Sequence, residues 1–403
     1  MLDTPEAQKV VLAHAKPLPA VEVSLDDALH RTLARPICCD VDYPPFDRSV
    51  MDGYAVRAAD VAQAPVTLRL VGQIPAGSTP VSALEPGEAV QINTGAPIPP
   101  GADAVVRVEA TELIDESTRV VIKTAVKPGK FITPRATYVS ADQTVLEAGT
   151  WMTPLEIGVA ATAGVTRVTV HRRPRVGVLV TGDELIDVGA KLTGARIRNT
   201  NEPVLTALVR TAQAQPVPLG IARDNLDSLK QKISEGLKED VLCVTGGISM
   251  GAFDFVPGAL KECGVTLHVE KMAIKPGRPV IFGTTDRPTL VFALPGNPLS
   301  AFVVFELLVR PALAALMGRA GMVPDLVRAV LRGSLKPTTE RRTYRPARAC
   351  VQEDGRWSVK PLSWHGSGDL FGAATANALI MQPPRTAGAV DGDTVSTILL
   401  EGV

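Results

Sequence analysis

The distribution of apolar residues divides the chain into stretches of two kinds. Between residues 173 and 319, continuous apolar runs such as RVGVLVTG, DVLCVTGG and TLVFALPG alternate with helical stretches such as EPVLTALVRTAQA and LDSLKQKISEGLKE. Apolar runs without polar alternation are typical of parallel strands that are buried on both faces. Because helical stretches separate them, these runs predict a doubly wound α/β domain.

The stretches on either side follow a different pattern. Residues 19–172 are rich in Val, Thr, Pro and Gly, and short alternating runs such as VTLRLVGQI end at turn signals such as Pro86-Gly87. From residue 320 onward short strands return, as in LVRAVLRGSL and RTYRPARACV. These patterns predict small β-rich domains before and after the α/β domain. A length of 403 residues agrees with three or four domains.

Composition indicates which binding partners and which cellular compartment to expect. Lys+Arg and Asp+Glu both number 42, so the chain lacks the basic excess that is typical of nucleic-acid binders. Its five cysteines form no CxxC pair and no zinc-binding spacing, as expected for reduced thiols. The N-terminus predicts a helix capped by Thr4 rather than a signal peptide, and no apolar run reaches the roughly 18 residues of a membrane span. We therefore expect a cytoplasmic protein without a membrane segment.

Three of the predicted strands end in loops that combine glycine with polar residues. In chain order these loops carry Thr181 and Glu184, then Gly246, Gly247, Ser249 and Asp254, then Pro295 and Pro298. In a doubly wound sheet, ligands bind beyond the carboxyl ends of the strands. Glycines there let backbone N–H groups approach an anion, and carboxylates beside an anion call for a cation such as Mg²⁺. The alternative interpretation is that a Gly-Gly loop serves turn geometry alone.

Five further residues have both a structural and a functional interpretation. Lys271 and Lys275, in KMAIKPGRP, form either a solvated turn or a cationic cradle for phosphate or an oxyanion. Asp224 lies where a helix should begin, so an N-cap is its simpler role. Asp52 precedes Gly53 in a strong hairpin-turn signal, and Thr94 lies in a loop rich in Gly and Pro.

Six motifs taken together resemble one family. They are FDRSVMDGYAVR, INTGAPIPPGADAVVR, VLVTGDEL, VTGGISMGAFDF, AIKPGRP and LPGNPLSAF. In this order and spacing they resemble the molybdopterin molybdenumtransferases, a family that includes the C-terminal domain of gephyrin. The resemblance covers nearly the whole chain and is weakest after residue 320. It implies an enzyme that inserts molybdate into adenylylated molybdopterin and releases AMP, which forms the molybdenum cofactor.

The resemblance also implies a homodimer of four-domain subunits. Residues 1–18 and 173–319 would form the α/β molybdopterin-binding domain, 19–40 and 140–172 a small linking domain, 41–139 a β-rich insert domain, and 320–403 a C-terminal β-barrel. The insert of one subunit would cover the α/β domain of its partner, so that each active site is composite. The molybdopterin adenylyltransferase that supplies the substrate is a further expected partner.

Carried over motif by motif, the family's active-site positions fall in two domains. They are Asp52 and Thr94 in the insert, and Glu184, Asp224, Asp254, Lys271, Lys275, Pro295 and Pro298 in the α/β domain. The three α/β carboxylates would hold Mg²⁺, and the two lysines would neutralise phosphate or molybdate. The residues expected to contact the pterin substrate are Thr181, Gly246, Gly247, Ser249, Pro295 and Pro298.

One position departs from the family pattern. The family carries an acid twelve residues before the threonine of an AGT motif, and counting back from Thr150 puts Tyr138 there. A tyrosine does not supply that negative charge near neutral pH. Three alternatives stay open: an enzyme that adenylylates molybdopterin, a non-catalytic scaffold or oxyanion receptor, and a tungstate-preferring paralogue. The long β-rich insert favours the insertion enzyme over the first.

Overall fold

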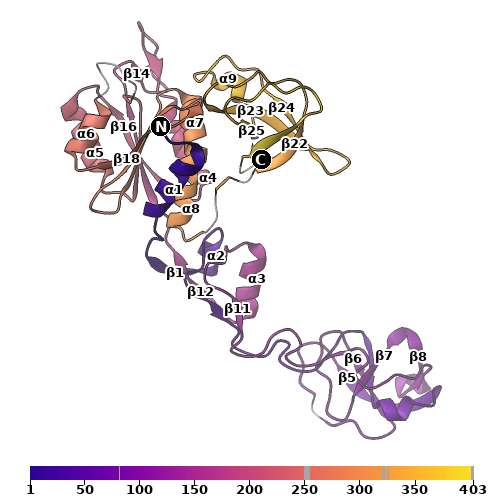
Figure 1. Cartoon of the computed structure of the whole chain (residues 1–403). Helices are drawn as coiled ribbons and strands as arrows, with labels where there is room; N and C mark the ends of the chain where they lie inside the picture. The colour runs from indigo at the N-terminus through magenta and orange to yellow at the C-terminus, as the bar shows by residue number, and fades with distance from the viewer. Residues whose placement is uncertain (81, 249–254, 320–322, 325, 401–403) are drawn as a thin grey trace.

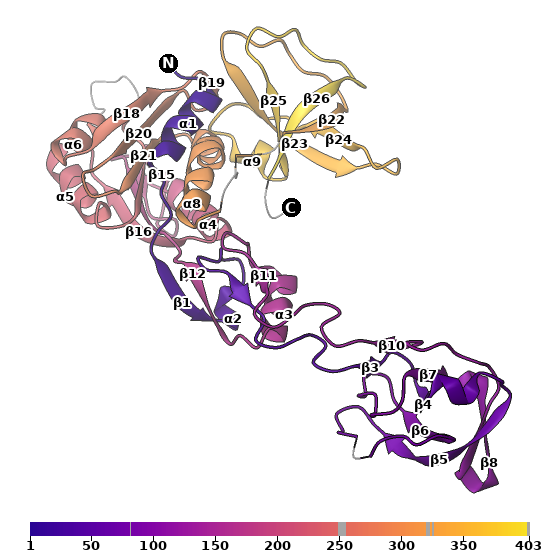
Figure 2. The same ribbon diagram turned by 60° about the horizontal axis from the view of Figure 1, so that its bottom comes forward.

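The computed structural model describes residues 1–80, 82–248, 255–319, 323–324 and 326–400. These residues form an elongated molecule, which Figure 1 shows from one side. An α/β part and a C-terminal β part lie side by side at one end. A small part follows in the middle, and a β-rich insert lies at the far end in both views (Figure 2).

The α/β part is built on a six-stranded sheet. Its strand order is β16 (Gln215–Ala222), β13 (Arg175–Thr181), β17 (Val241–Thr245), β21 (Leu290–Leu294), β20 (Pro279–Thr284) and β18 (Thr266–Lys271). The first four strands are parallel, whereas β20 is antiparallel to both of its neighbours. Every residue of β17 and β21 is buried, which explains why neither strand alternates with polar residues. The predicted doubly wound domain is confirmed.

Helices cover both faces of this sheet (Figure 1). One face packs against α1 (Thr4–His14), α4 (Asn201–Thr211), α7 (Pro298–Val304), the π-helix η4 (Phe305–Val309) and α8 (Arg310–Leu316). The other face packs against α5 (Leu226–Gly236) and α6 (Val256–Glu262). Each set encloses a separate hydrophobic core. Asp3, and not Thr4 as predicted, caps α1, because the Asp3 side chain accepts the Glu6 N–H.

The helix that α7, η4 and α8 form together is long and apolar enough to cross a membrane. It runs over 19 residues, Pro298–Leu316, with a mean hydropathy of 1.9. In the fold, 89% of its apolar stretch is buried inside the protein. It contacts α1 and α4 and is the central helix of the larger core.

Two β-rich parts continue the molecule away from the sheet. The nearer part pairs β1 (Ala20–Ser24) with β12 (Arg167–His171) and β2 (Ile37–Cys38) with β11 (Thr144–Leu146). It also contains the helices α2 (Leu25–Ala28) and α3 (Pro154–Thr162).

The insert holds a six-stranded sheet. Its strand order is β7 (Ala104–Arg107), β4 (Gly53–Val56), β6 (Glu88–Ile92), β5 (Val66–Ile74), β9 (Arg119–Ile122) and β8 (Thr111–Ile114). Its shorter elements are β3 (Arg48–Ser49), β10 (Ile132–Thr133), η1 (Ala58–Val61), η2 (Val108–Ala110) and η3 (Asp115–Ser117). Because β2–β11 and β3–β10 are antiparallel pairs, the chain leaves and returns along one path.

The C-terminal part is a closed five-stranded β-barrel, as the fold class predicted. Its strands are β22 (Leu326–Leu331), β23 (Arg342–Val351), β24 (Trp357–Pro361), β25 (Ala378–Gln382) and β26 (Thr394–Leu399). They close in the order β23-β24-β22-β26-β25, with β25 pairing back to β23. The short helix α9 (Leu370–Ala373) lies between β24 and β25.

The barrel is docked firmly on the α/β part. The short strand β19 (Ile274–Lys275) leaves the α/β part and pairs in parallel with β23 of the barrel. Barrel residues Tyr344 and Leu379 belong to the same hydrophobic core as Phe282 of the large sheet. The Tyr344 hydroxyl also lies 2.9 Å from Thr4 Oγ1 of α1. These contacts fix the barrel as a wall beside the carboxyl edge of the sheet.

A buried ion pair within the central helix generates a stability prediction. Arg310 and Glu306 are 9% and 6% exposed, and two N–O contacts of 2.6 and 2.8 Å join them. Glu306→Ala should lower the free energy of unfolding by about 1.5–3 kcal/mol, because the buried Arg310 guanidinium loses two charge-assisted hydrogen bonds. Urea denaturation measures this loss. The double change Glu306→Leu with Arg310→Met should lose clearly less, and equal losses would show that the two charges are not coupled.

Candidate functional site

The carboxyl ends of four parallel strands meet at one edge of the sheet. Thr181 of β13 is the register partner of Ala222 of β16, and Thr245 of β17 is the partner of Leu294 of β21. From β13 the chain first adds β16 on one side and later adds β17 on the other, so the strand order reverses between β13 and β17. Such a reversal opens a crevice in which ligands bind.

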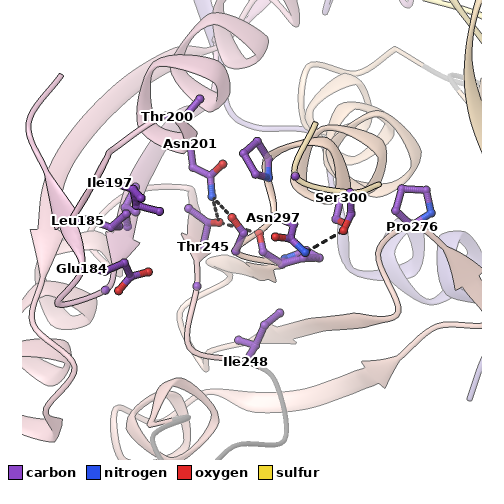
Figure 3. Close-up of a pocket in the computed structure, with 18 of the residues that line it drawn as sticks. Glu184, Leu185, Ile197, Thr200, Asn201, Thr245, Ile248, Pro276, Asn297 and Ser300 are labelled. Carbon is purple, nitrogen blue, oxygen red and sulfur yellow. Dashed lines mark hydrogen bonds between the residues drawn. The ribbon is translucent and has the colours of Figure 1, made fainter. Parts of the chain in front are cut away.

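A cavity of about 1200 Å³ lies at this reversal (Figure 3). The structure brings together in its lining most of the α/β residues that the sequence singled out: Thr181, Glu184, Asp224, Gly246, Gly247, Lys275, Pro295 and Pro298. Ser249 and Asp254 lie outside the described residues. Lys271 ends β18 and is not among the described residues that line the cavity.

The described lining carries an excess of positive charge. Its cationic residues are Arg196, Arg198, Lys275, Arg278 and Arg341, and its acidic residues are Glu184 and Asp224. Two of the arginines come from a projecting arm between β14 (Leu185–Ile186) and β15 (Ile197–Arg198). Clustered cations in a crevice raise the local concentration of anions. The cavity therefore favours a ligand with several negative charges.

Glycine is required in the loop after β17 because the main chain passes close to its neighbours. Gly246 has φ +99°, and a Cβ atom there would lie 2.4 Å from the carbonyl oxygen of Thr181. Gly247 has φ +61°, and its Cβ would lie 2.8 Å from Val256 Cγ2. No other residue adopts these conformations in this space at low cost. The two glycines are therefore needed for the geometry of the loop, and this requirement is compatible with a loop that also binds an anion.

A side-chain network joins the start of α4, the end of β17 and the loop after β21 at the floor of the cavity (Figure 3). Asn201 Nδ2 donates to Thr245 Oγ1 and to the carbonyl oxygen of Gly296, at 2.8 Å each. Thr245 Oγ1 in turn donates to the carbonyl oxygen of Pro295 at 2.9 Å. These bonds use both hydrogens of the Asn201 amide group and the hydroxyl of Thr245, and they hold these segments in one arrangement. Asn201 is the first residue of α4, three residues after the end of β15, and no sequence motif marked it.

The two described acids are held at the ends of neighbouring strands. Asp224 accepts a 2.6 Å hydrogen bond from Thr181 Oγ1 and a 3.2 Å bond from the Asp183 N–H. The predicted N-cap role of Asp224 is wrong, because Asn225 caps α5 through a bond from the Ser228 N–H. Glu184 is exposed, and a Cβ at Gly182 would lie 2.6 Å from its Oε2. The Glu184 carboxylate therefore folds back over the end of β13.

The barrel supplies a wall that sequence patterns did not reveal. Arg341, Trp364, Ser367 and Phe371 line the cavity from the C-terminal part. The Asn297 side chain donates to Ser367 Oγ at 2.8 Å, which joins this wall to the loop after β21. The only signal in the sequence was a glycine-rich stretch, WHGSGD, between two predicted strands. Its relevance depends on how the barrel packs.

Asp52 and Thr94 contact one another, but they lie in the insert and not at this cavity. The Asp52 carboxylate accepts the Thr94 N–H at 2.8 Å and Asn93 Nδ2 at 3.3 Å. These hydrogen bonds hold the pKa of Asp52 below its ordinary value, and the bond from the Thr94 N–H has the largest effect. The hairpin interpretation of Asp52 is wrong, because β3 and β4 are not paired with each other. Both views place the insert at the opposite end of the molecule from the α/β part, whose residues line the cavity (Figures 1 and 2).

Tyr138, where the family pattern has an acid, lies beside an arginine on the path to the insert. Its side chain is 60% exposed. The Arg48 Cζ atom is 5.7 Å from the Tyr138 ring centroid and 6.0 Å from that of Tyr43. This is the geometry of a cation–π contact. The position therefore keeps an interaction with a cation, although it carries no negative charge of its own.

The described residues contain no group of three or more His, Cys, Asp or Glu side chains that could by itself hold a metal ion. The two acids of the cavity remain as oxygen ligands. Mg²⁺ often binds through only one or two carboxylates and takes its other ligands from phosphate and water. The donor set of the cavity therefore suits Mg²⁺ when an anionic ligand is also bound.

Comparison with known proteins gives matches along the chain. Residues 2–164 match the family described as MoeA N-terminal region (domain I and II), residues 177–315 the probable molybdopterin binding domain, and residues 328–400 the MoeA C-terminal region (domain IV). Proteins named molybdopterin molybdenumtransferase match from Nostoc sp., at 37% identity over 90% of this chain and 84% of that protein, and from Bacillus subtilis, at 36% over 94% and 89%. The crystal structure of a molybdopterin biosynthesis MoeA protein from Pyrococcus horikoshii aligns over all of both chains, with a TM-score of 0.84 and 29% identity.

The close approach at Gly246 generates a prediction. Gly246→Ala should destabilise the protein by on the order of 2 kcal/mol or more, because a side chain at positive φ is strained and its Cβ meets a carbonyl oxygen. Thermal unfolding measures the loss. Gly258→Ala in α6 is the matched control, since nothing lies within 4 Å of its Cβ. The control should gain about 0.5–1 kcal/mol, and a Gly246→Ala protein as stable as wild type would contradict the described loop.

Proposed function

The chain belongs to the molybdopterin molybdenumtransferase family, and from this premise we propose that it inserts molybdate into adenylylated molybdopterin and releases AMP. The family name places it among the transferases of molybdenum-cofactor biosynthesis. The observation that carries the finer proposal is the cationic cavity at the reversal of strand order. Molybdate and the phosphoanhydride of the substrate are both anions, and this cavity has room and charge for both.

The chain's own residues would act mainly by positioning and by neutralising charge. Lys275 on β19 and Arg341, which directly precedes β23, line the cavity from neighbouring strands, so an anion beside them meets two cations. Splitting the bond between AMP and molybdopterin requires alignment and stabilisation of the negative charge on the departing phosphate. The lysine and arginine supply that stabilisation without forming a covalent intermediate.

We propose that Mg²⁺ is the cofactor of this cavity. Glu184 and Asp224 would hold it, together with Asp254, which the sequence predicts as a third ligand. When bound, the ion offsets the repulsion between these carboxylates and the substrate phosphate and acts as a Lewis acid toward that phosphate. Thr181 would keep one oxygen of Asp224 in a fixed direction through its hydroxyl hydrogen bond.

We also propose a homodimer with composite sites. Within one chain the insert, to which Asp52 and Thr94 belong, lies far from the α/β part (Figures 1 and 2). A two-fold axis gives a partner whose insert covers the cavity of the first subunit, and the reverse holds equally. Because hydrogen bonds keep its pKa low, Asp52 would bring a charged carboxylate to the site. Thr94 would bring its hydroxyl alongside.

Turnover with and without metal tests the function. Purified protein given adenylylated molybdopterin, molybdate and Mg²⁺ should release AMP. Glu184→Gln should lower this rate at least about tenfold, which equals about 1.4 kcal/mol of transition-state stabilisation. Asp187→Asn, an acid three residues away that is not among the described lining residues, is the matched control and should keep the wild-type rate.

Each contrary outcome of this assay points to a named alternative. Release of pyrophosphate from ATP and molybdopterin would identify an adenylylating enzyme. Binding of pterin and oxyanion without AMP release would identify a scaffold or receptor. Faster turnover with tungstate than with molybdate would identify a tungstate-preferring enzyme. Wild-type turnover that persists after exhaustive chelation of divalent ions would remove Mg²⁺ from the mechanism.

Complementation between two inactive variants tests the composite site. Asp52→Ala and Glu184→Ala homodimers should each be nearly inactive, because every site carries one lesion. In the mixed dimer one site collects both lesions, and its twin has an intact Asp52 and an intact Glu184. The mixed dimer should therefore recover about half of the wild-type rate if the sites act independently.

Differently tagged subunits, co-expressed and purified through both tags, provide the mixed species for measurement of AMP release. A stable mixed dimer that shows no recovery would mean that both residues serve a site within one chain. A protein that stays monomeric while turning over would contradict the dimer itself.

A further inference from the structure

Phe371 is an almost fully exposed aromatic residue on the wall that the barrel contributes to the cavity. It is 97% exposed, and it lines the cavity from helix α9. Single exposed apolar residues are common on protein surfaces, so exposure alone carries no argument. Phe371 differs from such residues because its ring lies at the cavity and its backbone is firmly held.

The turn that carries Phe371 is anchored to the α/β part. The Leu299 N–H at the start of α7 donates to the carbonyl oxygen of Ser367 at 3.1 Å. Asn297 Nδ2 donates to the hydroxyl of the same serine at 2.8 Å. These bonds attach the turn of the C-terminal part to the start of α7 in the α/β part.

The turn is also locked internally. The Asp369 carboxylate accepts the N–H groups of His365 and Gly372, at 2.9 Å each. A Cβ on Gly372 would lie 2.6 Å from the carbonyl oxygen of Ser363, so the backbone next to Phe371 is packed closely. The backbone that carries the exposed Phe371 ring is therefore held in place at the cavity.

The rest of the cavity lining explains what such a ring is suited to bind. The described lining contains two aromatic residues, Phe371 and the half-buried Trp364, and both belong to the barrel wall. The rest of the described lining includes Arg278 and the glycine loop of the α/β part and Lys275 of β19, and these groups suit anions. A ligand with charged groups at one end and a flat ring at the other would therefore find both kinds of contact.

We propose that Phe371 is a positioning residue that stacks on a flat, nitrogen-rich bicyclic ring of the substrate. This inference rests on the proposed function, whose substrate carries two such rings, a pterin and an adenine. Stacking on an aromatic side chain tolerates different bases because every base has a π-face. The phosphates and the oxyanion then reach the cationic residues of the cavity, while the ring is held at Phe371.

Steady-state kinetics separates stacking from a structural role. Phe371→Ala should raise KM for adenylylated molybdopterin about tenfold, equivalent to about 1.4 kcal/mol, and should leave kcat within about twofold. Phe371→Leu keeps an apolar side chain without a π-face and should behave like Phe371→Ala, whereas Phe371→Tyr should restore the wild-type KM. Unchanged KM in Phe371→Ala would overturn the inference while AMP release by the same protein upholds the proposed function.

A binding experiment without turnover identifies the ring. Phe371→Trp places an indole at the rim, and its fluorescence should be quenched on titration with the ring that stacks there. AMP alone and a simple pterin alone are the two probes, and Phe371→Leu is the background that retains the native tryptophans. Quenching by one probe only assigns the ring, and quenching by both assigns a surface that accepts either. Quenching by neither probe, beyond that of Phe371→Leu, would overturn the inference whether or not the protein turns over.

Discussion

The cavity exists because the C-terminal barrel and the α/β part share one hydrophobic core. Tyr344 and Leu379 of the barrel pack into the same cluster as Phe282 of the large sheet, and β19 extends the barrel by pairing with β23. Burial raises the pKa of Tyr344, so its hydroxyl stays protonated for the contact with Thr4. Without the barrel, the crevice at the carboxyl edge of the α/β sheet would be open to solvent on one side. The docked barrel closes that side and sets the distance between charges that come from different parts of the chain.

Different residues shape the floor of the cavity and supply its charges. The floor is formed by loops whose shape is fixed by Gly246 and by the bonds between Asn201, Thr245 and the carbonyl oxygen of Pro295. The charges come from the surrounding loops, the projecting arm and the barrel. Because the floor is held by buried hydrogen bonds, the charged groups around it do not have to maintain the shape of the site. They are available to contact the ligand.

Much of this arrangement followed from sequence, and the exceptions have physical causes. Continuous apolar runs marked the buried strands, and the strand-end position of Glu184 and Gly246 placed them at one edge, because parallel strands end together. The helix caps were displaced by one residue: Asp3 in place of Thr4, and Asn225 in place of Asp224. Neighbouring side chains compete for the same N–H groups, and local sequence does not decide between them. Arg341 and Phe371 were missed because their position depends on barrel packing, which no local pattern records. The domain boundaries and the roles of the site residues stay predictions.

The path to the insert has a mechanical consequence. Two antiparallel segments, which include β2–β11 and β3–β10, carry the insert at the end of a long arm (Figure 2). Where the arm begins, Asp42 accepts a bond from the Arg135 side chain at 2.5 Å and another from the Ala141 N–H at 2.8 Å, which braces one segment against the other. On a lever, a small rotation at the base becomes a large displacement at the tip. The stiffness of a few contacts around Asp42 therefore sets how accurately the insert, and with it Asp52, is positioned relative to the rest of the molecule.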